Sequence, residues 1–106
     1  MKIESVKENV AFRRAYHKGK CYATPYLSIY WRKNGSDKRR LGITVSKKIG
    51  SAVQRNRIRR IIRAAAYNCC DILPTRCDII IVARTRTKDL KSTDIERIIR
   101  ERFENN

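Results

Sequence analysis

The sequence predicts a single α+β domain, a two-layer sandwich in which helices cover one face of a small sheet. Three observations predict this class. Two segments alternate apolar and polar residues as strands do, one short apolar run is typical of a buried strand, and three segments have the 3.6-residue period of amphipathic helices. The chain has 106 residues, an ordinary size for one domain, so we expect residues 1–106 to share one core in the order α-β-β-β-α-β-α.

The first helix is expected over residues 6–18. Ser5 and Glu8 have the spacing of a capping box, and Gly19 can end the helix in a left-handed turn. Residues 20–25 are a candidate for a further short strand, which Pro25 would confine to a sheet edge.

Two alternating segments then predict an antiparallel pair of strands. YLSIYWR at 26–32 places Leu27, Ile29 and Trp31 on one side. After the turn residues NGSDK at 34–38, RLGITVSKK at 40–48 repeats the alternation. One face of this pair is expected to stay uncovered, with Tyr30 exposed on it.

The second helix is expected from the segment SAVQRNRIRRIIRAAAY at 51–67. Its residues Ile58, Ile61, Ile62 and Ala65 fall within an arc of about 100°, the width of a core-facing stripe, and the helix could continue to about residue 72. Five arginines, Arg55, Arg57, Arg59, Arg60 and Arg63, occupy the rest of its surface, and no acidic residue lies between Asp37 and Asp71. Such a face repels itself unless a partner neutralises it.

The last strand and helix complete the order. DIIIVAR at 78–84 is a continuous apolar run, which suits a central strand covered by helices. Thr93 and Glu96 have the spacing of a second capping box, so a final helix is expected over about 93–104.

The charge balance predicts a polyanionic partner. The chain carries 26 Lys and Arg against 10 Asp and Glu, a net charge of +16, while 42% apolar residues argue against disorder. Guanidinium groups suit phosphate oxygens. RNA is favoured over DNA because Phe12, Tyr16, Tyr26 and Tyr30 could stack on unpaired bases, although aromatic residues at such spacing more often pack in a core.

Other classes are disfavoured. No apolar run reaches the length of a membrane span, and the N-terminal segment has acids where a signal peptide would be apolar, so a cytoplasmic protein is expected. Cys21, Cys69, Cys70 and Cys77 lack zinc-site spacing and are expected to be reduced structural thiols. Because the acids are scattered, we expect neither a metal site nor a catalytic centre in the protein alone.

The segment SKKIGSAVQRNRIRRIIRAA at 46–65 resembles the signature of the bacterial ribonuclease P protein subunit. Arg55, Asn56 and Arg57 match the Arg-Asn-Arg core of that signature. The resemblance extends over nearly the whole chain, through AFRRAYHKGK, YLSIYW, RLGITVSKKIG and DIIIVAR.

The resemblance implies an accessory subunit of an RNA-based endonuclease that removes the 5′ leader from precursor tRNA. It implies that Mg²⁺ is held mainly by the RNA subunit, and that the partners are the catalytic RNA and leader-bearing precursor tRNA, with no membrane and no obligate protein partner. It also implies a fold like the second domain of a small-subunit ribosomal protein, with a left-handed β-α-β crossover where periodicity alone would favour a right-handed one.

The resemblance further implies two groups of site residues. A leader-binding cleft would use Phe12, Tyr16 and Tyr30. Contacts to the catalytic RNA would use Lys47, Lys48, Arg55, Asn56, Arg57, Arg59, Arg60 and Arg63. Composition alone leaves two alternatives open, a structural RNA binder such as a ribosomal protein and a membrane-surface protein with a basic amphipathic helix.

Overall fold

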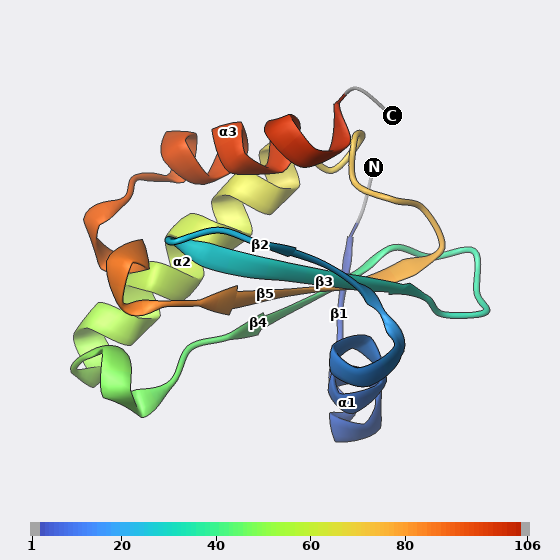
Figure 1. Cartoon of the computed structure of the whole chain (residues 1–106), viewed down its shortest axis with the longest axis horizontal. Coiled ribbons are helices and arrows are strands. Elements are labelled where there is room, and N and C mark those ends of the chain that lie inside the picture. The colour runs from blue at the N-terminus through green and yellow to red at the C-terminus, as the bar shows by residue number, and fades with distance from the viewer. Residues whose placement is uncertain (1–2, 105–106) are drawn as a thin grey trace.

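The structure is a computed structural model that describes residues 3–104. It contains one mixed five-stranded sheet in the order β1-β4-β5-β3-β2, with helices on both faces (Figure 1). The elements are β1 (Glu4–Ser5), α1 (Asn9–Lys18), β2 (Lys20–Ala23), β3 (Leu27–Lys33), β4 (Arg40–Thr44), the 3₁₀ turn η1 (Lys47–Ile49), α2 (Ala52–Asn68), β5 (Cys77–Ala83), the 3₁₀ turn η2 (Thr85–Asp89) and α3 (Ser92–Phe103). The α+β class and the order of the elements are confirmed, and β1 is an addition.

The expected antiparallel pair of β3 and β4 is wrong, because β5 lies between them. β5 pairs antiparallel with β3, with Ile81 opposite Ile29, and parallel with β4, with Ile79 opposite Leu41. A strand that is apolar on both faces is most stable at the centre of a sheet, and this outweighs the closeness of β3 and β4 in the sequence. Helix α2 therefore connects two parallel neighbours, β4 and β5.

The main core lies between the sheet and the helices α2 and α3. Its fully buried members include Ile29 and Ile81 from the sheet, Ile58 and Ile62 from α2, and Ile99 from α3. The isoleucine stripe predicted for α2 is confirmed as its buried face. Because this stripe is buried, the opposite face of α2, which carries the arginines, is turned toward solvent.

Helix α1 packs on the other face of the sheet, which corrects the expectation that the helices cover a single face (Figure 1). Ala11 and Ala15 are buried against Ile80, with Val6 completing a second, smaller core. The two small side chains let the helix approach the sheet closely. Part of the face that was expected to be uncovered is thus covered by α1.

The N-terminus of α1 differs from the expectation because Ser5 belongs to β1. The amide of Val6 donates to the carbonyl of Leu41 at 2.9 Å, so the chain is still in the sheet where a helix was expected. The capping box of Ser5 and Glu8 is therefore wrong, and α1 begins at Asn9.

Helix α1 ends before Gly19, but for a different reason from the expected one. Gly19 is extended, with φ −85°, and the left-handed turn is wrong. A Cβ on Gly19 would lie 2.5 Å from the carbonyl oxygen of Ala15 and 2.7 Å from that of Trp31. Only glycine fits this crossing of two backbones.

The ends of α2 and α3 also differ. A capping box that the sequence analysis did not identify begins α2. The Ser51 hydroxyl accepts from the Gln54 amide at 3.3 Å, and the Gln54 side chain accepts from the Ser51 amide at 2.9 Å. The helix ends at Asn68, before the expected residue 72.

In α3 the predicted box of Thr93 and Glu96 is wrong. The helix begins at Ser92, and Asp94 accepts from the Lys91 amide at 2.8 Å.

Candidate nucleic-acid interface

The arginines of α2 are the first component of the candidate interface. Within residues 3–104 no ion pair involves Arg55, Arg57, Arg59, Arg60 or Arg63, whereas Arg40, Arg97 and Arg100 each pair with a carboxylate. The uncompensated charge predicted for this helix is confirmed. Because α2 is held by its buried isoleucines, the face that carries these arginines is turned away from the core.

The arginines of α2 point in different directions, because successive residues of an α-helix are rotated about its axis. Arg57 points toward the segment before α3, where its guanidinium donates to the carbonyls of Lys88 and Leu90, both at 3.4 Å. Arg59 donates to the Asn56 side chain at 3.2 Å. Asn56 and Arg57 of the Arg-Asn-Arg core therefore contact different parts of the protein.

Arg59 and Arg63 face the edge of the sheet where β1 and β4 meet. Together with Tyr67 they line one wall of a groove of about 210 Å³, and Phe12 and Ile43 line other parts of it. We refer to it as the edge groove. Tyr67 is 51% exposed and was not identified from the sequence; the signal available was its spacing of four and eight residues from Arg63 and Arg59.

The aromatic residues predicted for the leader site are the second component, and the structure brings all three together. The rings of Phe12 and Tyr16 lie 6.4 Å apart, and those of Tyr16 and Tyr30 lie 5.1 Å apart in an edge-to-face arrangement. The Tyr16 hydroxyl shares a hydrogen bond of 2.8 Å with the Thr44 hydroxyl. We call this surface, formed by Phe12, Tyr16 and Tyr30 on the α1 side of the sheet, the aromatic face.

Tyr30 lies on the predicted side of β3 but is half-buried, so the expectation of an exposed ring is only partly confirmed. The alternation of β3 correctly gives the face on which Tyr30 lies, but it cannot show that α1 returns across that face. Burial, together with the neighbouring Cys21 thiol, raises the pKa of Tyr30 above its ordinary value. The ring is therefore neutral at physiological pH, as a stacking surface for a base requires.

Gly42 is a further site residue, one that the sequence analysis did not identify. A Cβ at this position would lie 2.8 Å from the ring of Phe12 and 2.8 Å from the Cδ1 atom of Ile80. The missing side chain therefore lets Phe12 reach across β4. A glycine inside an alternating strand is a recognised signal for such a close approach.

Lys47 and Lys48 lie on η1, directly after β4 and before α2. Both are exposed, and the turn is fixed by the Ser46 hydroxyl, which accepts from the Lys48 amide at 3.2 Å. The two lysines thus occupy the connection between Thr44, next to the aromatic face, and the first turn of α2.

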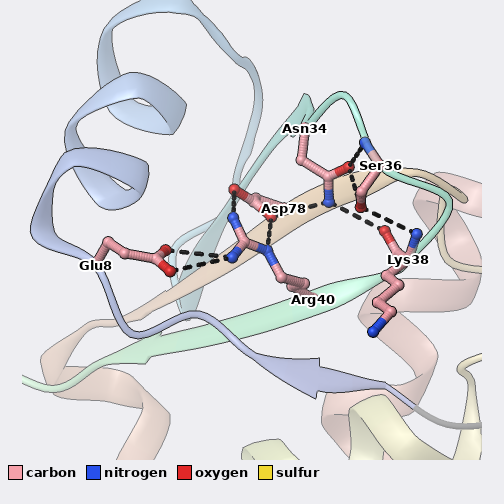
Figure 2. Close-up of polar contacts among 6 residues, drawn as sticks. All are labelled: Glu8, Asn34, Ser36, Lys38, Arg40 and Asp78. Atoms are coloured by element: carbon pink, nitrogen blue, oxygen red, sulfur yellow. Dashed lines mark hydrogen bonds and ion pairs between the residues drawn. The ribbon is translucent and has the colours of Figure 1, made fainter.

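A polar cluster holds the N-terminal end of α1 against the sheet (Figure 2). The Arg40 guanidinium donates to the buried Asp78 carboxylate at 2.6 and 2.8 Å and to Glu8 at 3.2 Å. Asn34 also donates to Asp78, at 3.0 Å. The hydrogen bonds to Asp78 raise the pKa of Arg40, and both acids of this region are engaged internally rather than opposing a phosphate.

Residues 3–104 hold no group of three or more His, Cys, Asp or Glu side chains placed to bind a metal ion. None of the four cysteines forms a disulfide within residues 3–104; Cys69 and Cys77 are buried, and Cys21 is exposed. In the same part of the chain, no helix combines the length and apolarity of a membrane span.

Comparison with known proteins identifies the family. The sequence model of the Ribonuclease P family matches residues 1–105. The chain is 41% identical over 100 residues to the ribonuclease P protein component of Clostridioides difficile, which covers 93% of this chain and 88% of that protein. It is 38% identical to the corresponding component of Clostridium novyi, covering 90% of this chain and 86% of that one.

Solved structures agree with the sequence comparison. The RNase P protein of Staphylococcus aureus superposes with a TM-score of 0.81 at 37% identity, covering 94% of this chain and 92% of that one. The fold is also that of the RNase P protein from Thermotoga maritima, with a TM-score of 0.83 at 24% identity and 97% of each chain covered. With the basic face of α2 and the aromatic face beside β4, these matches lead to one conclusion: the chain belongs to the ribonuclease P protein family.

Proposed function

We propose that this protein is the accessory subunit of a cytoplasmic ribonucleoprotein endonuclease that removes the 5′ leader from precursor tRNA. The basic face of α2, with Lys47 and Lys48, binds the catalytic RNA, and the aromatic face binds the single-stranded leader. One observation carries the proposal: within residues 3–104 the arginines of α2 have no ion pair, and Arg59 and Arg63 share the edge groove with Phe12, one of the three rings of the aromatic face.

The physical chemistry of the two surfaces supports this division. Guanidinium groups bind phosphate oxygens and release counterions from the nucleic acid, which favours a folded RNA of high charge density. Aromatic rings stack on bases that are already unpaired, as in a leader strand. The first surface suits a structured RNA, and the second suits a single strand.

The proposal assigns no bond-breaking step to the protein. In it, Mg²⁺ is held mainly by the RNA subunit and supplies the activated hydroxide and the charge stabilisation for phosphodiester hydrolysis. The side chains of the protein position the leader and bind RNA phosphates. The protein acts by binding and orientation, so it lowers the Mg²⁺ concentration at which the RNA works.

A cleavage assay tests the proposal. Precursor tRNA is incubated with a bacterial ribonuclease P RNA at low, near-physiological Mg²⁺, with and without the protein. The protein is expected to increase the rate of cleavage at the mature 5′ end. A rate that does not change at saturating protein contradicts the proposal.

A further inference from the structure

The edge groove shares Phe12 with the aromatic face but is otherwise lined by residues of α2 and of the β1–β4 edge. Its volume of about 210 Å³ is below the roughly 300–1,000 Å³ of usual small-molecule sites. A groove of this size suits part of a polymer rather than a free metabolite. Its walls belong to α2, to Phe12 of α1 and to the β1–β4 edge, so it is formed by tertiary packing.

One wall of the groove is cationic. Arg59 and Arg63 are one helical turn apart, both line the groove, and neither has an ion pair within residues 3–104. The acid in the groove, Glu4, is bridged by the Lys38 ammonium at 3.0 Å. The groove therefore keeps a net positive wall that suits a phosphate group.

An exposed aromatic ring stands next to this wall. Tyr67 lies one turn beyond Arg63 and leaves 51% of its surface exposed. Tyrosines with a structural role usually bury the ring, so a half-exposed ring beside two arginines that form no ion pair within residues 3–104 is poorly explained by packing. Base stacking explains it, because every base presents a flat apolar face.

The floor of the groove offers backbone hydrogen-bonding groups. The Val6 amide donates to the Leu41 carbonyl at 2.9 Å, and β1 has already ended at Ser5. Alternate residues of a strand turn their amide and carbonyl groups to the same side, so Ile43 turns its own to the edge that Leu41 uses. No strand of residues 3–104 covers that edge beyond β1, and Ile43 lines the groove.

We propose that the edge groove binds one unpaired nucleotide of the catalytic RNA. Its base stacks on Tyr67 and meets the Ile43 backbone at its edge, and its phosphate lies between Arg59 and Arg63. The assignment of the RNA rests on the proposed function, whereas the nucleotide site rests on the groove itself. Tyr67 is thereby a contact residue in addition to those implied by the Arg-Asn-Arg signature.

Chemical probing of single nucleotides tests this inference. A bacterial ribonuclease P RNA is probed with base-modifying and 2′-hydroxyl-acylating reagents, alone and with saturating wild-type protein. The same RNA is then probed with Tyr67→Ala, with Tyr67→Phe and with the control Val53→Ala, which changes a side chain of the same helix that is 79% exposed and does not line the groove. Thermal unfolding by circular dichroism confirms that each variant is folded.

Tyr67→Ala is expected to lose protection at one nucleotide and to keep the remaining footprint. The dissociation constant of the Tyr67→Ala variant for the catalytic RNA is expected to rise by about 5- to 150-fold, the range for loss of one stacked base. Tyr67→Phe keeps the protected nucleotide because it keeps the ring, and Val53→Ala changes nothing. A Tyr67→Ala footprint identical to that of the wild type overturns the inference but leaves the proposed function intact. Absence of any wild-type footprint contradicts both.

Discussion

The Tyr16 hydroxyl and the Thr44 hydroxyl lie 2.8 Å apart and join α1 to the end of β4. The bond holds the ring of Tyr16 over the sheet, at an edge-to-face contact with Tyr30. Two segments that are 28 residues apart in the sequence thus form one aromatic surface. The proposed leader site depends on this arrangement.

Tyr16→Ala is expected to weaken the binding of leader-bearing precursor tRNA by about 1–3 kcal/mol, the value of one base–aromatic stack. Affinity for the catalytic RNA should stay nearly unchanged, because Tyr16 is not on α2. Tyr16→Phe, which keeps the ring and loses the bond to Thr44, should retain most of the affinity. Filter binding with precursor and with catalytic RNA measures both quantities, and equal loss for the two RNAs would contradict the assignment.

Arg63→Ala is expected to reduce the salt dependence of catalytic RNA binding. Each lost phosphate contact lowers the slope of log K against log salt concentration by about one. The matched control is Arg97→Ala, which removes an exposed arginine of α3 that already pairs with Asp94. Titrations at several salt concentrations should show a smaller slope for Arg63→Ala alone, and a wild-type slope would remove Arg63 from the interface.

Asp78→Ala is expected to destabilise the fold by about 2–3 kcal/mol. The change removes the acceptor of two Arg40 hydrogen bonds and one from Asn34, and leaves a partly buried guanidinium without its main partner (Figure 2). Glu8→Gln, at the more exposed side of the same arginine, should cost less than about 1 kcal/mol. Urea unfolding measures both, and similar values for the two variants would disprove the proposed role of the buried carboxylate.

The cysteines allow a direct test of where the leader lies. Cys21 is exposed and lies opposite Tyr30 in the β2–β3 register, whereas burial raises the pKa of both Cys69 and Cys77. A raised pKa lowers the thiolate fraction, so iodoacetamide near pH 8 should alkylate Cys21 before these two. A saturating single-stranded leader oligonucleotide should slow the Cys21 reaction alone. Peptide mass spectrometry follows each thiol, and an unchanged Cys21 rate would place the leader elsewhere.

Local patterns in the sequence predicted where the strands and helices lie better than they predicted which strands are adjacent in the sheet. The alternation around Ile29 and the isoleucine stripe of α2 identified a strand and a helix, because each period is set within one segment. The pairing of strands was not predictable in this way. Ile79, Ile80 and Ile81 make β5 apolar on both of its faces, so β5 is most stable at the centre of the sheet. This preference competes with the direct β3–β4 hairpin, which needs only a short connection, and β5 lies between the two strands.

Helix ends and side-chain exposure were also less predictable, because both depend on contacts with segments that are distant in the sequence. Ser5 and Glu8 have capping-box spacing, but pairing with β4 uses Ser5 in β1 instead. The side of the sheet that carries Tyr30 followed from alternation, while its half-burial follows from the return of α1. Tyr67 was missed because an aromatic residue at the end of an amphipathic helix is usually a core residue, and only the structure shows it exposed beside Arg63.

The most direct measurement of the central claim compares how one complex binds its substrate, precursor tRNA, and its product, mature tRNA. The dissociation constants of precursor tRNA and mature tRNA are measured with the catalytic RNA alone and with the RNA plus this protein, at the same salt and Mg²⁺ concentrations. The account predicts that the protein strengthens precursor binding more than mature tRNA binding, because only the precursor has a leader for the aromatic face. Equal strengthening of both would contradict it.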